Sequence, residues 1–248
     1  MVLTTEFKSG GYRYVSGVFQ YSGGVAALPG HRLVRVRFST QLPLVEGMKR
    51  AESITASQGR PAKAICAFEL RSPAPFTEAG FRTFNELYVG QLDAWGVIDG
   101  DRNPVARSNV CPMNAPPPEP SVHAFTFAVQ GDGPPSAAIS GSAEAPEGKV
   151  NYRDHIVALG DTSKPALLKK AEFVVNEMER RFHALDFRWS DVTTSQIYSV
   201  HNIHPLMSRD LLLGGAARSE LVWHFCRPPV VGMEFEMDCR IVHEEWVV

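Results

Sequence analysis

The sequence lacks an excess of charge of either sign, a long apolar run and paired cysteines. Its 25 lysines and arginines nearly balance 27 aspartates and glutamates, which argues against a nucleic-acid partner. The longest apolar runs, such as residues 64–68, are far shorter than the roughly 20 residues that span a membrane. The 4 cysteines are dispersed without a CxxC pair, so we expect reduced thiols and neither a disulfide framework nor a zinc site.

Common catalytic and targeting motifs are also missing. The chain has no P-loop, no GxGxxG after a predicted strand, no HExxH and no GxSxG, which argues against nucleotide, zinc-hydrolase and serine-hydrolase chemistry. His201 and His204 are interrupted by Pro205 and have no third ligand nearby, so we interpret them as loop histidines. The N-terminus shows no secretory signal. We therefore expect a cytoplasmic protein whose chemistry requires no metal.

The residues present suit a globular protein built from two similar halves. At 44% hydrophobic and 21% charged over 248 residues, the chain can bury a normal core. The tripeptide at 15–17 recurs in similar form at 139–141, and Ala-Arg-Ser at 106–108 recurs at 217–219. Each Ala-Arg-Ser opens one predicted strand and is followed by another. These matches predict a tandem duplication.

The sequence of each half predicts two helices between its strands. The clearest helix covers residues 165–185, where apolar side chains repeat at helical spacing, and its counterpart covers 42–56. Second helices are expected at 76–95 and, shorter, at 203–213. The closing strand at 232–242 alternates apolar and acidic residues, which is typical of a sheet with helices on one face.

The boundary between the halves is marked by a loss of periodicity. The proline-rich segment 112–120 occupies the same place in its half as 226–232 does in the other, so we interpret it as a loop between two closing strands. Between residues 130 and 136 the sequence Gly-Asp-Gly-Pro-Pro consists of turn-forming residues. It interrupts both the helical and the strand periodicity. The sequence therefore predicts domains at 1–130 and 136–248.

Two arginines at matching positions are the first candidate site residues. Arg107 and Arg218 each lie at the start of a predicted strand, where a guanidinium can grip a carboxylate by two parallel hydrogen bonds. The alternative is that both are surface arginines in exposed ion pairs.

An acidic residue in the closing strand is the second candidate. Glu234 follows Arg218 by 16 residues, far enough for the chain to return beside it, and a carboxylate there can take a proton from water. The alternative is a solvated polar face, because Glu236 and Asp238 lie on the same side of the strand. The corresponding position in the first half is His123.

These short motifs, in this order, make the chain resemble the RidA/YjgF family of reactive-intermediate deaminases. In the second half they lie at 139–141, 190–192, 217–219 and 233–236, and in the first half at 14–17, 84–88 and 106–108. The resemblance implies an α+β fold: a tandem duplication of a chorismate-mutase-like domain, each copy a mixed sheet with two helices on one face. It also implies deamination of enamines and imines without a cofactor, and a homo-oligomer, a trimer or hexamer, with sites in clefts between units.

The resemblance also suggests roles for the candidate residues. Arg218 would hold the substrate carboxylate and Glu234 would activate water, while Arg107 with His123 would form a second carboxylate clamp or a decayed copy of the site. The family's early Gly-Pro-Tyr-Ser-Gln segment is absent from both halves. The aromatic wall of the pocket is therefore unassigned.

The tandem arrangement at this length most resembles the deaminases of 2-aminomuconate and its chlorinated form in aminophenol and nitroaromatic degradation. The expected partner is accordingly a small dicarboxylate, hydrolysed at a C–N bond with release of ammonia. Two alternatives remain: a chorismate-processing hydrolase of related fold, and a non-catalytic protein that binds carboxylate metabolites. Ammonia release distinguishes the first expectation from both.

Overall fold

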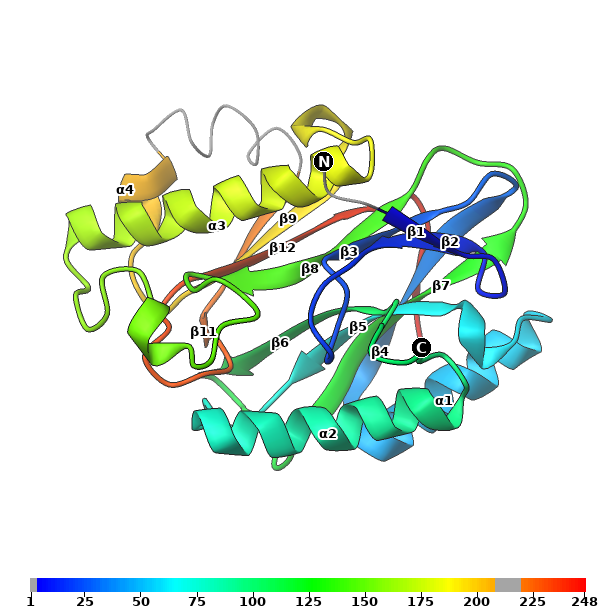
Figure 1. The fold of residues 1–248 in the computed structure, drawn as a ribbon, viewed down its shortest axis with the longest axis horizontal. Coiled ribbons are helices and arrows are strands. Elements are labelled where there is room, and N and C mark those ends of the chain that lie inside the picture. Colours follow the sequence, from blue (N-terminus) through cyan, green and yellow to red (C-terminus); the bar gives the residue numbers. More distant parts are fainter. Residues whose placement is uncertain (1–3, 208–219) are drawn as a thin grey trace.

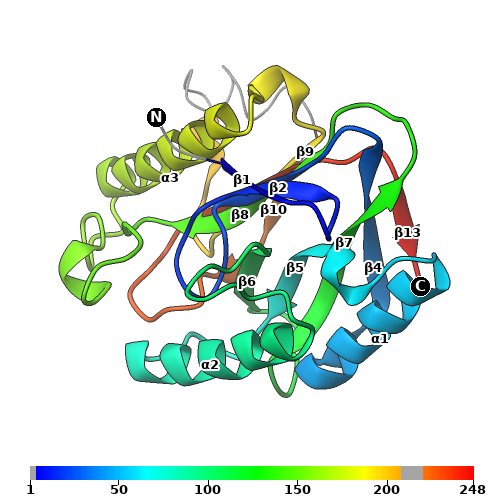
Figure 2. The same cartoon turned by 45° about the vertical axis from the view of Figure 1, so that its right-hand side comes forward.

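Two β-sheets lie face to face between helices in the computed structural model, which describes residues 4–207 and 220–248. Helix α3 (Lys164–Ala184) covers the outer face of one sheet, and α1 (Leu44–Ser57) and α2 (Glu78–Ala94) cover the outer face of the other, as Figures 1 and 2 show. A short helix, α4 (His204–Met207), lies near α3. The described part of the chain is thus a four-layered arrangement of helix, sheet, sheet and helix.

The two sheets differ in size and in the strands at their edges. The larger has the order β1 (Thr4–Phe7), β2 (Tyr12–Val15), β3 (Gly24–Ala27), β8 (Ala137–Ala143), β12 (Glu236–Ile241), β9 (Thr194–Tyr198), β10 (Glu220–His224). The smaller has the order β11 (Cys226–Arg227), β6 (Ala106–Pro112), β5 (Ile65–Arg71), β7 (Ser121–Gln130), β4 (His31–Pro43), β13 (Glu245–Val247). Short 3₁₀ turns lie at Ala62–Ala64, Arg153–His155 and Trp189–Asp191.

The centre of each sheet repeats one topology. The order β4-β7-β5-β6 recurs as β8-β12-β9-β10, and in both sets the last pair is parallel and the other two are antiparallel. The strand that opens each set leads to a helix, α1 after β4 and α3 after β8. This arrangement confirms the predicted α+β fold and its duplication.

The helices and loops of the duplicated units agree with most of the predicted ranges. The helices predicted at 42–56, 76–95 and 165–185 correspond to α1, α2 and α3, whereas the one predicted at 203–213 extends beyond the described residues. The match between 15–17 and 139–141 was wrong as a guide to equivalence, because β4 and not β2 takes the place of β8. Three small residues in a strand are too few to identify a counterpart.

Strands cross between the two halves at the sheet edges. The first strands of the chain, β1 to β3, extend the sheet of the second half beside β8, and the last strand, β13, pairs in parallel with β4 of the first half. The proline-rich segment joins β6 to β7, and residues 131–136 join β7 to β8. The division into units at 1–130 and 136–248 stays a prediction.

The polar face of the closing strand is covered rather than solvated. In β12, Met237 and Cys239 pack beneath α3, while Asp238 points toward β5 of the other sheet. Asp238 is buried and accepts hydrogen bonds from Gln196 Nε2 (2.7 Å) and the Tyr198 hydroxyl (2.8 Å). The expected solvated face is wrong for this strand, because the second sheet of the duplicated chain lies against it.

A buried ion pair fixes the approach to β12. Lys170 Nζ in α3 lies 3.2 Å from Glu144 Oε1 and donates to the Val157 carbonyl at 2.7 Å. Glu144 in turn accepts the backbone N–H groups of Glu234 (2.6 Å) and Phe235 (3.1 Å). Both side chains of the pair are fully buried. This network holds the segment before β12 against the connection between β8 and α3.

We expect Lys170→Met to lower the free energy of unfolding by about 3 kcal/mol, because it leaves the Glu144 carboxylate buried without a cation. Denaturant titration measures the change. Lys169→Met is the matched control, since Lys169 is exposed on the same helix and should change stability by less than about 0.5 kcal/mol. Equal effects of the two substitutions would contradict a structural role for the pair.

Candidate active site

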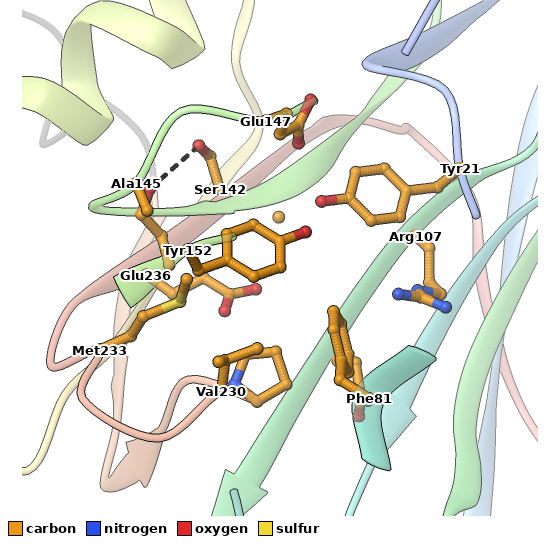
Figure 3. A pocket seen from close by; sticks show the side chains of 14 residues that line it. Tyr21, Phe81, Arg107, Ser142, Ala145, Glu147, Tyr152, Val230, Met233 and Glu236 are labelled. Carbon is orange, nitrogen blue, oxygen red and sulfur yellow. Dashed lines mark hydrogen bonds between the residues drawn. The ribbon is translucent and has the colours of Figure 1, made fainter. Parts of the chain in front are cut away.

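A cavity lies where β6 of one sheet approaches β8 and β12 of the other, as Figure 3 shows. Its charged and aromatic walls are Tyr21, Phe81, Arg107, Glu147, Tyr152 and Glu236. The free volume is about 40 Å³, room for about three water molecules or one small charged group. An outer hollow of about 440 Å³ shares Phe81 and Tyr152 as walls. A ligand can therefore place one end inside and the rest in the outer hollow.

Arg107 contributes a buried cation to this cavity. The residue is 3% exposed, and its Nη1 donates to Asn85 Oδ1 at 2.7 Å. Its guanidinium lies 4.9–5.7 Å from the ring centres of Tyr21, Phe81, Phe84 and Tyr88. Burial lowers its pKa, and it forms no ion pair with a carboxylate among the described residues. Aromatic faces thus stabilise the charge while leaving it free to bind an anion.

The segment Ser140–Gly141 in β8 positions both sides of the cavity. Ser140 Oγ accepts the backbone N–H of Arg107 at 3.0 Å and donates to the Ser22 carbonyl at 2.5 Å. A Cβ atom at position 141 would overlap the carboxyl group of Glu236. A larger residue at position 141 would displace the Glu236 carboxyl from this place.

Glu236 lies across the cavity from Arg107 and belongs to the other half of the chain (Figure 3). It is 4% exposed, and its carboxyl has no hydrogen-bond partner among residues 4–207 and 220–248. Burial, followed by the nearby Asp238, raises the pKa of Glu236 well above its usual value, although Arg107 acts in the opposite direction. The carboxyl is therefore able to keep its proton at a pH where an exposed carboxyl is ionised, and to exchange it with a ligand.

Two tyrosines form the aromatic wall that the sequence left unassigned. The hydroxyl groups of Tyr21 and Tyr152 point toward each other across the cavity in Figure 3. Tyr152 comes from residues 144–163, which separate β8 from α3, whereas β4 runs directly into α1 in the other copy. Glu78 Oε1 at the start of α2 accepts the backbone N–H groups of Tyr152 (3.1 Å) and Arg153 (2.9 Å). The added segment is thereby fastened over the cavity.

The predicted site residues of the second half lie outside this cavity or outside the described residues. Glu234 Oε2 is 2.8 Å from His201 Nε2 and 2.8 Å from Arg227 Nη1, so its carboxylate is already paired. Arg218 lies outside the described residues. The proposed partnership of Arg218 with Glu234 stays a prediction.

His123, the predicted partner of Arg107, lies in a different hollow. It lines a surface depression with Arg37 and Pro117, whereas Arg107 lines the inner cavity. Burial, followed by the charge of Arg71, lowers the pKa of His123 to about 3, so its imidazole is neutral at neutral pH. The structure does not bring Arg107 and His123 together in one cavity.

Sequence reasoning identified Arg107 but passed over Glu236 and both tyrosines. Glu236 was visible as one of several acids on an alternating strand, and the signal that could have singled it out was the duplication itself. Two stacked sheets must bury the facing side of β12. Tyr21 and Tyr152 lie in connecting segments, where no helical or strand periodicity predicts which way a side chain points.

Among the described residues, no group of three or more histidine, cysteine, aspartate or glutamate side chains is placed to hold a metal ion. Within the same ranges, the helices are too short or too polar to cross a bilayer.

The chain shares its fold with a chorismatase of known structure. A chorismatase crystal structure matches 97% of this chain and 85% of its own, with a TM-score of 0.57 and 14% identity, a likeness that establishes the fold alone. A single-unit protein, RidA from the Antarctic bacterium Psychrobacter sp. PAMC 21119, matches 44% of this chain and 80% of its own, with a TM-score of 0.32 and 12% identity.

The sequence comparison is more specific. The model of the family described as 2-aminomuconate deaminase CnbZ matches residues 4–246, and the chain belongs to that family. A relative from Comamonas testosteroni, named 2-amino-5-chloromuconate deaminase, is 44% identical over 245 residues, 98% of each chain.

The raised pKa of Glu236 predicts a pH-dependent stability. Because the folded protein holds this proton more tightly than the unfolded chain, the free energy of unfolding falls as the pH rises above the unfolded carboxyl pKa of about 4.3. Glu236→Gln removes this dependence, so its stability advantage over the original chain should grow between about pH 5 and about pH 8. Denaturant titrations across that range measure it.

The control for this measurement is Glu172→Gln, on the exposed side of α3. Its stability difference from the original chain should stay constant over the same range. A constant difference for Glu236→Gln as well would show that this carboxyl ionises normally.

Proposed function

We propose that the chain is a cofactor-free hydrolytic deaminase of 2-aminomuconate-type dicarboxylates, including the 5-chloro compound. The observation that carries the proposal is a buried Arg107 that has no carboxylate partner in the part of the chain that the structure describes and faces a protonatable Glu236 across a small cavity. Membership of the 2-aminomuconate deaminase family and the name of the 44% identical relative support the substrate class. The products would be the 2-hydroxy or 2-oxo dicarboxylate and ammonia.

Arg107 binds the carboxylate next to the reacting carbon. A guanidinium can donate two parallel hydrogen bonds to a carboxylate, and the surrounding rings exclude the water that would weaken this contact. The cavity accommodates one such group, so the remainder of a six-carbon diacid extends toward the outer hollow. This placement brings C2 of the substrate between Arg107 and Glu236.

Glu236 exchanges the protons of the reaction. The neutral carboxyl protonates the enamine carbon, which converts the C2 amine to an iminium, and the resulting carboxylate takes a proton from the water that attacks C2. Glu236 then returns that proton to nitrogen, ammonia leaves, and the C2 hydroxyl loses its proton to Glu236 as the carbonyl forms. The carboxyl ends in its starting state, so one water is consumed and one ammonia is released.

The other predicted residues keep proposed roles. Arg218 is a candidate ligand for a substrate carboxylate, and Glu234, held by His201 and Arg227, is a candidate for activating water beside it. His123 is a candidate carboxylate contact in its own hollow.

We also propose a cytoplasmic homo-oligomer, a trimer or hexamer. The resemblance to RidA/YjgF proteins supports the assembly, as do the exposed apolar side chains of Met113 and Phe225 on adjacent segments, because such patches favour association. The four cysteines are free and buried, which suits a reducing compartment.

Arg107→Met should weaken use of the substrate. Loss of a buried charge-assisted contact is expected to lower kcat/KM by about 10- to 100-fold, measured by ammonia release from 2-aminomuconate. Arg102→Met is the control, since Arg102 is an exposed arginine paired with Asp99. If Arg107→Met and Arg102→Met retained equal kcat/KM, Arg107 would not be the carboxylate ligand.

Glu236→Gln should lower kcat by about 10²- to 10⁴-fold, the usual contribution of one general acid-base, while the protein remains folded and able to bind. Single-turnover ammonia release measures the chemical step. Near-normal turnover would remove Glu236 from the mechanism, and comparison with Glu234→Gln under the same conditions tests the two carboxylates separately.

A further inference from the structure

Asn109 is a side chain of the cavity wall whose hydrogen bonding is incomplete. It lines the inner cavity and is 3% exposed. Its Oδ1 accepts a hydrogen bond from Ser72 Oγ at 2.9 Å, whereas its Nδ2 is shielded from water and has no partner among the described residues. The Ser72 hydroxyl thus fixes which end of the amide is occupied, and leaves the nitrogen as a free donor.

An unpaired buried donor is destabilising, and such groups are rare in folded proteins. Ser108, the preceding residue, also carries a buried oxygen without a partner, but its side chain does not line this cavity. Asn109 differs because its side chain borders a space that a ligand can fill. A ligand atom that accepts a hydrogen bond would complete the pairing.

The strand geometry places Asn109 beside Arg107. Residues two apart in a strand point to the same side and lie about 7 Å apart, and both side chains border a free volume of about 40 Å³. This volume accommodates one small group rather than two. A carboxylate offers two oxygens with about four acceptor positions, so one carboxylate can accept from the guanidinium and from the amide.

We propose that Asn109 is a substrate-binding residue whose Nδ2 donates a hydrogen bond to the same carboxylate that Arg107 binds. Ser72 is its positioning residue. Arg107 supplies charge, and the amide supplies a further hydrogen-bond donor to the same carboxylate. This inference rests on the proposed function for the identity of the substrate, but the contact itself requires only a carboxylate ligand.

The experiment removes the donor and its positioning partner together. Ser72→Ala with Asn109→Leu replaces both polar groups by apolar ones of similar size, a change that is often neutral or stabilising for the fold. We expect muconate, a stable diacid probe, to bind this double variant about tenfold more weakly by calorimetry. KM for 2-aminomuconate should rise by a similar factor with kcat within about twofold, since the contact is present before and during the reaction.

Ser108→Ala is the matched control, because it removes a neighbouring buried and unpaired oxygen that does not border the cavity. Its affinity for muconate should be unchanged. Asn109→Asp keeps the side-chain shape but replaces the donor by a charged acceptor, and should weaken muconate binding by more than tenfold. This variant tests the contact if the double variant does not fold.

The outcomes separate this inference from the proposed function. Muconate affinity equal to that of the original chain in the double variant, or loss of thermal stability without loss of affinity, would overturn the role of Asn109. So would failure of the original chain to bind muconate. If muconate binds and weakens as expected but no ammonia is released from 2-aminomuconate, the contact stands and the deaminase assignment falls.

Discussion

A guanidinium buried without a counter-ion among the residues that the structure describes is the constraint on which the site depends. Such a charge is expensive to remove from water, and here helix α2 provides most of the compensation. Asn85 accepts a hydrogen bond from Arg107, and Phe81, Phe84 and Tyr88 present their rings to it. The buried face of α2 therefore holds an arginine in a fixed place. Because no carboxylate in the described part of the chain neutralises it, its charge is available to an incoming anion.

Two buried carboxyl groups between the stacked sheets have pKa values shifted in opposite directions. Glu69 forms two hydrogen bonds with Arg35 at 2.5 and 2.7 Å; burial alone would raise its pKa, but Arg35 holds the pKa well below its usual value. Among residues 4–207 and 220–248, no guanidinium lies within hydrogen-bond distance of Glu236, and burial raises its pKa. An arginine in direct contact makes one acid a structural anion. Its absence leaves the other a proton donor and acceptor.

The sequence was sufficient for the architecture and for one side of the site. Helical periodicity predicted α1, α2 and α3, because each of these helices buries one regular face. Alternation of apolar and polar residues predicted the closing strand β12, although the other sheet covers its polar face. The repeated Ala-Arg-Ser led to Arg107. Glu236 could not be distinguished from Glu234 and Asp238 by alternation, since the choice depends on where the other sheet lies. Tyr152 and the exchanged edge strands depend on long-range pairing, for which a local pattern carries no signal.

The strands exchanged between the sheets bear on how the duplicated chain can change during evolution. β3 pairs with the outer side of β8, and β13 pairs with the outer side of β4, so each unit closes an edge that belongs to the other. A gene fragment encoding one unit alone would display an open backbone ladder, the template on which chains aggregate. After fusion, selection can still change either unit. Separation into two independent units is disfavoured, because each would expose an unpaired sheet edge.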